Sequence, residues 1–401
     1  MPQVLVVNSG SSSIKYRLIE TDGPTNLARG LVERIGTATA TGTYGQMADD
    51  SWVEVRETAP MADHDDGLRA VIAALDRAKL AAGITAVGHR VVHGGDRFVA
   101  PALIDDAVVD GIRAQIPLAP LHNPANLAGI EVARSLWPDV PQVAVFDTAF
   151  HATLPPHAYR YAVPDTWYTQ HRVRRYGFHG TSHAFVARRA AEILGRPLAQ
   201  LRLITAHLGN GASVTAITGG RSVDTSMGLT PLEGLVMGTR SGDIDPAIVF
   251  HLARNAGLTL NEIDAALNSA SGLRGLCGDN DLRAIEARAA RGDDAAQLAI
   301  DVFCYRVRRY IGAYAAVLGG LDALVFTAGI GEHSPTVRAR VCADLGFLGI
   351  AIDPTANAAS ATMISATGTA AAVLVVPTDE ELEIAVQTLA AINRQPASDP
   401  R

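Results

Sequence analysis

Hydrophobic and polar positions along this chain follow two alternating patterns, one typical of buried strands and one typical of helices. Short apolar runs predict strands at 4–7, 14–19, 86–92, 143–146, 324–327 and 373–376, with two more inside 203–217. Apolar residues at helical spacing predict helices at 68–82, 125–136, 182–194, 246–257, 281–290, 294–318 and 381–393. The alternation of strands and helices predicts an α/β fold whose ligands lie at the carboxyl ends of the strands.

The turn after the first strand has a composition suited to binding an anion. Asn8 is followed by a run of serines around Gly10, and Lys15 lies at the start of the next strand, directly after Ile14. Small residues let a backbone approach a ligand closely, and Ser hydroxyls and backbone N–H groups can point at a phosphate. A tight hairpin or a flexible loop has a similar composition.

A second stretch repeats this pattern about half a chain later. Residues 203–217 contain an apolar run, a turn of small residues at Gly209–Ser213 and a second β-rich run. Two ordinary hairpins with favourable turn residues would look alike. Both turns are richer in small polar residues than a hairpin requires, so we favour duplication of one structural unit.

The length of the chain indicates the number of domains, and its net charge argues against some classes of binding partner. The 401 residues are enough for two domains of ordinary size. The net charge of −7 argues against binding to nucleic acid or to an anionic membrane. We expect no signal peptide and no membrane-spanning run, and therefore a cytoplasmic protein.

Three minor features receive structural interpretations. The basic segment His171–Arg175 is interpreted as a solvated surface, and Gln395–Arg401 as a frayed tail. The three cysteines have no metal-like spacing, so we expect buried thiols in a reducing cytosol: Cys277, Cys304 and Cys342.

Polar residues follow the apolar runs at positions where strand ends would bring them to one edge of a sheet. Polar loops are common, but these residue types are those of phosphate and metal chemistry. The residues are Asn8, Arg90, Asp147, His207, Gly329 and Glu380.

Two arginines and a histidine are candidates for binding a phosphoryl group. Arg90 and Arg240 lie in glycine-rich segments and could bind an anion in a bidentate manner, or each could be an ion-pair partner. His179 could donate to a phosphoryl oxygen, whereas His183 could be a helix-start residue satisfied by the backbone.

Two carboxylates are candidates for Mg²⁺. Asp147 and Glu380 offer hard oxygens, although Glu380 and Glu381 could simply stabilise a helix N-terminus. There is no Gly-x-x-x-x-Gly-Lys-Ser/Thr loop, and the Gly329–Gly331 turn lacks the third glycine of a dinucleotide fingerprint.

Nine ordered motifs together resemble the acetate kinase family, within the acetate and sugar kinase/Hsp70/actin superfamily. They span almost the whole chain: Asn8–Lys15, Gly88–Gly95, Leu118–Pro124, Val145–His151, Arg175–His183, His207–Ser213, Gly238–Pro246, Phe326–Ser334 and Pro377–Leu382. The resemblance implies two duplicated ribonuclease-H-like, actin-like ATPase domains with an interdomain cleft. The first would comprise 1–148 plus 382–401, and the second, carrying most of the nucleotide site, 149–381.

The resemblance also implies a reaction and partners. ATP and acetate would give ADP and acetyl phosphate, reversibly and with Mg²⁺, or alternatively Mn²⁺, in a homodimer. A carboxylate acceptor is already ionised at neutral pH, so we expect direct in-line transfer without a strong general base. Asp147 would then organise the metal or water rather than deprotonate acetate.

Site residues follow from the resemblance, position by position. Catalysis is assigned to Arg90, Asp147, His179 and Arg240, and the metal to Asn8 and Glu380. The acetate site is assigned to Arg90, Val92, Leu121, Phe178 and Pro231. ATP is assigned to Lys15, His207, Leu208, Gly209, Asn210, Gly211, Asp281, Leu282, Arg283, Gly329, Ile330, Gly331, Glu332 and His333.

Departures from the family pattern lie in the nucleotide site. Cys277–Arg283 differs from the expected Ser-rich form, in which Phe often precedes the Arg, and His333 stands where Asn is common. The close alternative is a propionate or butyrate kinase. A more distant alternative is an actin- or Hsp70-like ATPase, although no peptide-binding domain follows the nucleotide fold.

Overall fold

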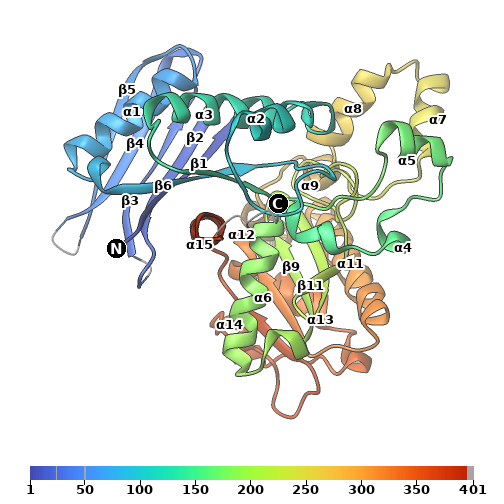
Figure 1. Ribbon diagram of the computed structural model, residues 1–401. Helices are drawn as coiled ribbons and strands as arrows, with labels where there is room; N and C mark the ends of the chain where they lie inside the picture. The colour runs from blue at the N-terminus through green and yellow to red at the C-terminus, as the bar shows by residue number, and fades with distance from the viewer. Residues whose placement is uncertain (24, 49–50, 395–401) are drawn as a thin grey trace, which may run out of the picture. The chain divides into compact units, whose positions relative to one another are not determined.

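The computed structural model describes residues 1–23, 25–48 and 51–394 (Figure 1). These residues form two compact units. Unit 1 contains Met1–Phe150 and the segment that begins at Asp379, and unit 2 contains His151–Thr378. The predicted frayed tail at 395–401 lies outside the described residues.

Unit 1 is built on an eight-stranded sheet with the order β5-β4-β3-β2-β1-β6-β8-β7. The strands are β1 Gln3–Gly10, β2 Ser13–Glu20, β3 Thr25–Glu33, β4 Thr37–Ala48, β5 Ser51–Met61, β6 Ile84–Val91, β7 Ala102–Leu103 and β8 Gln142–Phe146. The helices are α1 His64–Arg77, α2 Asp106–Arg113, α3 Asn123–Leu136 and α15 Glu380–Asn393.

Successive residues of β1 supply two different hydrophobic cores because side chains alternate between the faces of a strand. Leu5 and Val7 pack in a core with α1, which lies with α3 along the sheet in Figure 1. Val4 and Val6 pack in the other core with Ile384 and residues of β6, β8 and α15. Both faces of the central strands are therefore covered.

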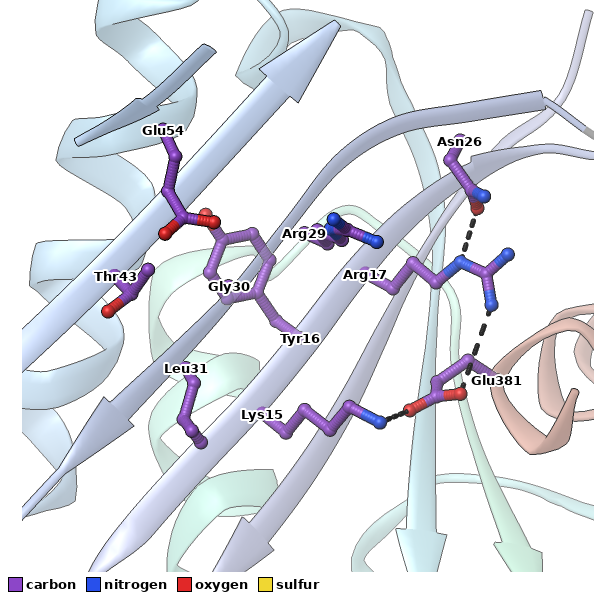
Figure 2. Close-up of a pocket in the computed structure, with 10 residues that line it drawn as sticks. All are labelled: Lys15, Tyr16, Arg17, Asn26, Arg29, Gly30, Leu31, Thr43, Glu54 and Glu381. Carbon is purple, nitrogen blue, oxygen red and sulfur yellow. Dashed lines mark hydrogen bonds and ion pairs between the residues drawn. The ribbon is translucent and has the colours of Figure 1, made fainter. Parts of the chain in front are cut away.

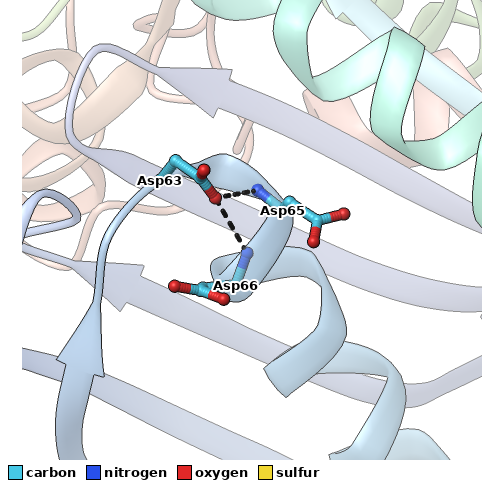
Figure 3. A group of neighbouring side chains, drawn as sticks. All are labelled: Asp63, Asp65 and Asp66. Carbon is cyan, nitrogen blue, oxygen red and sulfur yellow. Dashed lines mark hydrogen bonds between the residues drawn. The ribbon is translucent and has the colours of Figure 1, made fainter.

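Three aspartates lie at the start of α1, and the side chains of two of them cap the helix (Figure 3). Asp63 is the N-cap, and its Oδ1 accepts hydrogen bonds from the backbone N–H groups of Asp65 at 2.9 Å and Asp66 at 3.2 Å. Asp66 Oδ2 accepts from the Ala62 N–H at 2.8 Å. These contacts satisfy the first amides of the helix and complement its positive end.

Unit 2 is built on a five-stranded sheet with the order β11-β10-β9-β12-β13. The strands are β9 Arg202–Leu208, β10 Ala212–Thr218, β11 Arg221–Thr225, β12 Ala323–Thr327 and β13 Ala372–Val375. The helices are α4 Pro156–Tyr159, α5 Asp165–His171, α6 Gly180–Leu194, α7 Ala247–Asn255, α8 Leu260–Ser269, α9 Gly272–Cys277, α10 Leu282–Ala289, α11 Asp294–Leu318, α12 Ala328–His333, α13 Pro335–Cys342 and α14 Pro354–Ala358. Short 3₁₀ turns occur at Ala81–Gly83, Ile116–Leu118, Ala149–Thr153, Leu198–Gln200 and Gly346–Leu348.

The two sheets share one topology. In unit 1, β3, β2 and β1 are antiparallel neighbours, and β6 and β8 continue the sheet parallel to β1. In unit 2, β11, β10 and β9 are antiparallel, and β12 and β13 continue parallel to β9. The expected duplicated α/β architecture is therefore confirmed.

The strands β3 to β5 are absent from the prediction, which expected strands and helices to alternate through the first 150 residues. Every residue of β5 from Val53 to Pro60 is exposed. Its sequence mixes Glu, Arg and Thr with valines, so it contains no apolar run that marks a buried strand. Among the described residues, no helix is long and apolar enough to cross a membrane.

The thiols follow the prediction only in part. Cys304 and Cys342 are buried, and burial raises the pKa of each to about 12. Cys277 is half-buried, at the end of a short helix, so it is not a core thiol.

Candidate functional site

Strand register brings three of the predicted residues together in unit 1. Asn8 lies near the end of β1, Arg90 lies in the neighbouring parallel strand β6, and Asp147 directly follows β8. Parallel strands end at the same edge of a sheet, so the three side chains lie in a row.

Arg90 binds Asp147 with two hydrogen bonds. Arg90 Nε donates to Asp147 Oδ1 at 3.1 Å and Nη2 donates to Oδ2 at 2.5 Å. The third nitrogen, Nη1, makes a longer contact of 3.4 Å with Asn8 Oδ1. The Asp147 side chain is 1% exposed and that of Arg90 is 23% exposed, so this is a largely desolvated ion pair.

Burial and the neighbouring charge shift the pKa of each member of this pair in opposite directions. Burial raises the pKa of Asp147, and the Arg90 guanidinium lowers it in part. Burial disfavours the charged form of Arg90, but Asp147 and Glu380 together raise its pKa. Both Asp147 oxygens accept from Arg90, which leaves this carboxylate poorly placed to remove a proton from a substrate.

Oxygen donors suited to Mg²⁺ lie in the same part of unit 1. Glu380 begins α15, and its charge influences the pKa values of both Arg90 and Asp147. An amide oxygen from Asn8 and a carboxylate from Glu380 are ligands of the kind that Mg²⁺ accepts. This donor chemistry fits the expected metal.

Lys15 forms an ion pair in the structure. Its ammonium contacts Glu381 at the border of a cavity of 370 Å³ (Figure 2). Arg17, which also lines this cavity, donates to Asp379 at 2.5 Å. The Lys15 side chain is still 57% exposed. Its assignment to ATP stays a prediction, and a phosphate would have to compete with Glu381 for this ammonium.

Two asparagines that the sequence analysis missed position the Arg90 segment. Asn126 Oδ1 accepts from the Val92 N–H at 3.0 Å, and Asn126 Nδ2 donates to the Ser9 carbonyl at 2.7 Å. Asn123 similarly exchanges two hydrogen bonds with the backbone of His93. The sequence signal is a pair of asparagines about one helical turn apart in the first part of α3.

In unit 2, His179 and Arg240 converge on Gly211. A Cβ placed on Gly211 would lie 2.9 Å from Arg240 Nη2 and 3.5 Å from His179 Nε2. His179 has a left-handed backbone with φ of 56° at the start of α6. That conformation is uncommon for a residue with a side chain and often marks functional sites.

Arg240 is a half-buried cation that pairs with no carboxylate among the described residues. Its Nη1 donates to the Pro231 carbonyl at 2.6 Å, and burial lowers the pKa of the guanidinium. A desolvated charge of this kind is costly unless an anion binds it. Arg240 is therefore the strongest sign of an anion site in unit 2.

His207 and its neighbours lie next to His179. The rings of His179 and His207 stack with centroids 4.1 Å apart, and His207 Nδ1 contacts Ser182 Oγ at 2.8 Å. After β9, Asn210 Oδ1 accepts from Asn280 Nδ2 at 3.2 Å. A Cβ on Gly238 would lie only 2.0 Å from the same Asn210 oxygen, so a side chain there would displace the Asn210 amide.

The other predicted ATP residues lie on separate elements. Asp281 caps α10 and pairs with Arg283, and both are exposed. Gly329–His333 form most of α12, which begins at the left-handed residue Ala328. Each group is found at a strand or helix end, as expected, and its role in binding stays a prediction.

The predicted acetate residues are divided between the units. Val92 is buried and Leu121 is 74% exposed in unit 1, while unit 2 contains buried Phe178 and half-buried Pro231. Their common role in binding the methyl group therefore stays a prediction.

The interpretation of His171–Arg175 as a solvated surface is wrong for Arg175. Its side chain is only 16% exposed, donates to Glu233 at 2.6 Å and donates to the carbonyls of Thr225 and Ser226. Glu233 also accepts from the Tyr161 hydroxyl. These contacts connect the segment before His179 with the segment that contains Pro231.

Comparison with known sequences shows a consistent family. The model of the acetokinase family matches residues 3–386. The acetate kinase of Clavibacter michiganensis subsp. michiganensis is 56% identical over 399 residues, covering 98% of this chain and 99% of that protein. The acetate kinase of Syntrophobacter fumaroxidans is 53% identical over 400 residues, covering 98% and 97%.

Solved structures agree. Porphyromonas gingivalis acetate kinase superposes with a TM-score of 0.93 at 44% identity, covering 98% of this chain and 100% of that one. A propionate kinase from Francisella tularensis gives a TM-score of 0.92 at 43% identity, covering 97% and 100%. The chain therefore belongs to the acetokinase family, kinases whose phosphoryl acceptor is a carboxyl group.

Proposed function

We propose that the chain transfers the γ-phosphoryl group of ATP directly to the carboxylate of acetate, reversibly, giving acetyl phosphate and ADP. The observation that carries this proposal is Arg240, a cation without a carboxylate partner among the described residues, directed with His179 Nε2 at the space above Gly211. Such an arrangement suits the oxygens of a phosphoryl group. Membership of the acetokinase family supports ATP and a small carboxylate as the substrates.

The proposed step needs no proton transfer. An acetate oxygen attacks the γ-phosphorus, a new phosphorus–oxygen bond forms, and the bond to the bridging oxygen breaks with its electron pair leaving on ADP. Acetate is ionised at neutral pH, so a general base has no proton to remove. This agrees with an Asp147 whose oxygens are both bonded to Arg90.

Each side chain then has an electrostatic or orienting role. Arg90 binds the acetate carboxylate and the transferring group, and Asp147 fixes the orientation of Arg90. His179 and Arg240 stabilise charge on the phosphoryl oxygens in a metaphosphate-like transition state. Asn8 and Glu380 would hold Mg²⁺, or Mn²⁺, which when bound would neutralise charge on the ATP phosphates.

The remaining assignments extend this proposal. ATP would contact Lys15, His207–Gly211, Asp281–Arg283 and Gly329–His333. The homodimer and the cytoplasmic location stay predictions based on the family and the sequence.

Trapping of the product tests the central proposal. ATP, Mg²⁺, acetate and hydroxylamine should yield acetohydroxamate with the purified protein, and omission of acetate should abolish the product. Propionate and butyrate are run in parallel. ATP hydrolysis that is independent of all three acids, with no hydroxamate, would overturn the proposal in favour of an ATPase.

Substitution of Val92 tests the acetate pocket. The Val92→Ala change removes two methyl groups, and about one methylene of extra space should raise the ratio of kcat/KM for propionate to that for acetate by about 3–10-fold. The Val91→Ala variant is the matched control, because Val91 is fully buried in a hydrophobic cluster with Phe98 and Phe146. A ratio that changes equally in both variants, or in neither, would place the pocket elsewhere.

A further inference from the structure

His179 is the first member of a chain of hydrogen-bonded side chains that runs into the core of unit 2. His179 Nδ1 lies 2.9 Å from Ser213 Oγ, which lies 2.7 Å from His183 Nε2. His183 Nδ1 lies 2.7 Å from Thr205 Oγ1. Ser213, His183 and Thr205 are each 0% exposed, so this chain is closed to solvent beyond His179.

The direction of these hydrogen bonds follows from the hydroxyl of Thr205. Among the described residues, Thr205 Oγ1 makes its only side-chain hydrogen bond with His183 Nδ1. A buried hydroxyl must donate its hydrogen, so Thr205 donates to that nitrogen. If the order were reversed, the Thr205 hydrogen would be buried without an acceptor.

The position of the Thr205 proton determines the positions of the protons on His183, Ser213 and His179. Burial lowers the pKa of His183 well below its usual value, so the ring is neutral and carries one proton. With Nδ1 accepting from Thr205, that proton lies on Nε2 and is donated to Ser213. The Ser213 hydroxyl is then left to donate to His179 Nδ1, and a neutral His179 must carry its own proton on Nε2.

We propose that Thr205, His183 and Ser213 are positioning residues that hold His179 in the Nε2–H tautomer, with that N–H directed at the ligand above Gly211. The inference deepens the proposed function, on which it rests for the identity of the ligand as a phosphoryl group. A donor at Nε2 suits an anion, whereas the reversed chain would present a lone pair to it.

The surroundings of His179 favour this neutral donor over a charged one. His207 stacks on its ring with a 4.1 Å centroid separation, and Arg240 Nη2 is directed at the same point above Gly211. The other neighbouring histidine, His183, is separated from His179 by the Ser213 hydroxyl. Arg240 already supplies a positive charge in this group, so a second charge on His179 would be repelled.

A pair of Thr205 variants separates the hydroxyl from the shape of the side chain. Thr205→Val removes the hydroxyl at nearly constant volume, and Thr205→Ser retains it. Thr215→Val is the matched control: Thr215 is also fully buried and lies on the neighbouring strand β10, and its hydroxyl lies 2.8 Å from Thr225 Oγ1.

Nitrogen NMR of the full chain labelled with ring-¹⁵N histidine reads the tautomer directly, with the His179→Gln spectrum assigning the signal. We expect Nε2–H for His179 in the wild type, Thr205→Ser and Thr215→Val, and loss of that preference in Thr205→Val. The kcat of Thr205→Val should fall by about 10-fold with KM for ATP and acetate nearly unchanged, because a charge-stabilising donor is no longer held in place.

The wild-type spectrum alone can overturn the inference, even if Thr205→Val fails to fold. A His179 proton on Nδ1 in the wild type, or an unchanged tautomer in folded Thr205→Val, would contradict it. These spectra require no substrate, so their outcome is independent of hydroxamate formation, on which the proposed function depends.

Discussion

Replacement of Arg90 by alanine should lower kcat by at least about 10³-fold, because the transition state loses a cation and Asp147 loses the group that it orients. The same change should destabilise the fold by about 3 kcal/mol, because it leaves a buried carboxylate unpaired. Asp147 is 1% exposed and accepts from Arg90 at 3.1 and 2.5 Å. Steady-state kinetics and urea unfolding measure the two effects.

The destabilisation should depend on pH in a definite direction. Burial raises the pKa of Asp147, and removal of the opposing Arg90 charge raises it further. The folded variant then binds a proton more tightly than the unfolded chain, so its stability is greatest at low pH and falls as the pH rises through the folded pKa. Unfolding curves at several pH values between about 5 and 8 test the sign.

A double variant separates the two roles of the pair. Arg90→Ala with Asp147→Asn removes both charges and should recover part of the stability but none of the activity. If the double variant is no more stable than Arg90→Ala, the unpaired Asp147 is not the cause of the destabilisation.

Replacement of Arg240 by alanine should also lower activity, but without the loss of stability expected for Arg90→Ala. We expect kcat to fall by about 10²–10³-fold, since the phosphoryl oxygens lose a preorganised cation. Stability should stay unchanged or rise, because the protein loses a desolvated charge that has no carboxylate partner among the residues described. Kinetics with saturating ATP and acetate, combined with thermal unfolding, distinguish the outcomes.

Arg338 provides the contrast. It is fully buried, and its guanidinium donates to carbonyls of Gly331, Glu332 and Asn357 and to the Asn357 side chain. The Arg338→Met variant should therefore lose stability, while Arg240→Ala should not. A large loss of stability in Arg240→Ala would show that Arg240 supports the fold rather than an anion.

The elements that could be predicted from the sequence are those whose burial requires a run of apolar residues. Strands with both faces buried, such as β8 and β12, appear as continuous apolar sequence and were predicted within about two residues. The strand β5 is exposed along most of its length and is held by its pairing with β4, whose Ala40 and Tyr44 are buried in the core of unit 1. A strand held by pairing alone leaves little periodic signal in its own sequence.

The residues of the candidate site whose own side chains suit phosphate or metal chemistry could be predicted from the sequence. Asn8, Arg90 and Asp147 follow strands, and strand order brings them together. The supporting contacts were not predictable, because they depend on how helices pack on the sheet. His183 meets Thr205 and Ser213 only because α6 packs against β9, and no spacing in the sequence shows that contact.

The return of α15 to unit 1 affects how the protein is made. Ile384 and Ala385 complete a core with Val4, Val6 and Val145, whose codons are translated long before theirs. The first 150 residues therefore emerge from the ribosome with one face of their sheet uncovered, and this face stays exposed until almost the whole chain has been synthesised. Unit 1 can therefore complete this core only after unit 2 has been translated, whereas unit 2 can fold from a continuous segment.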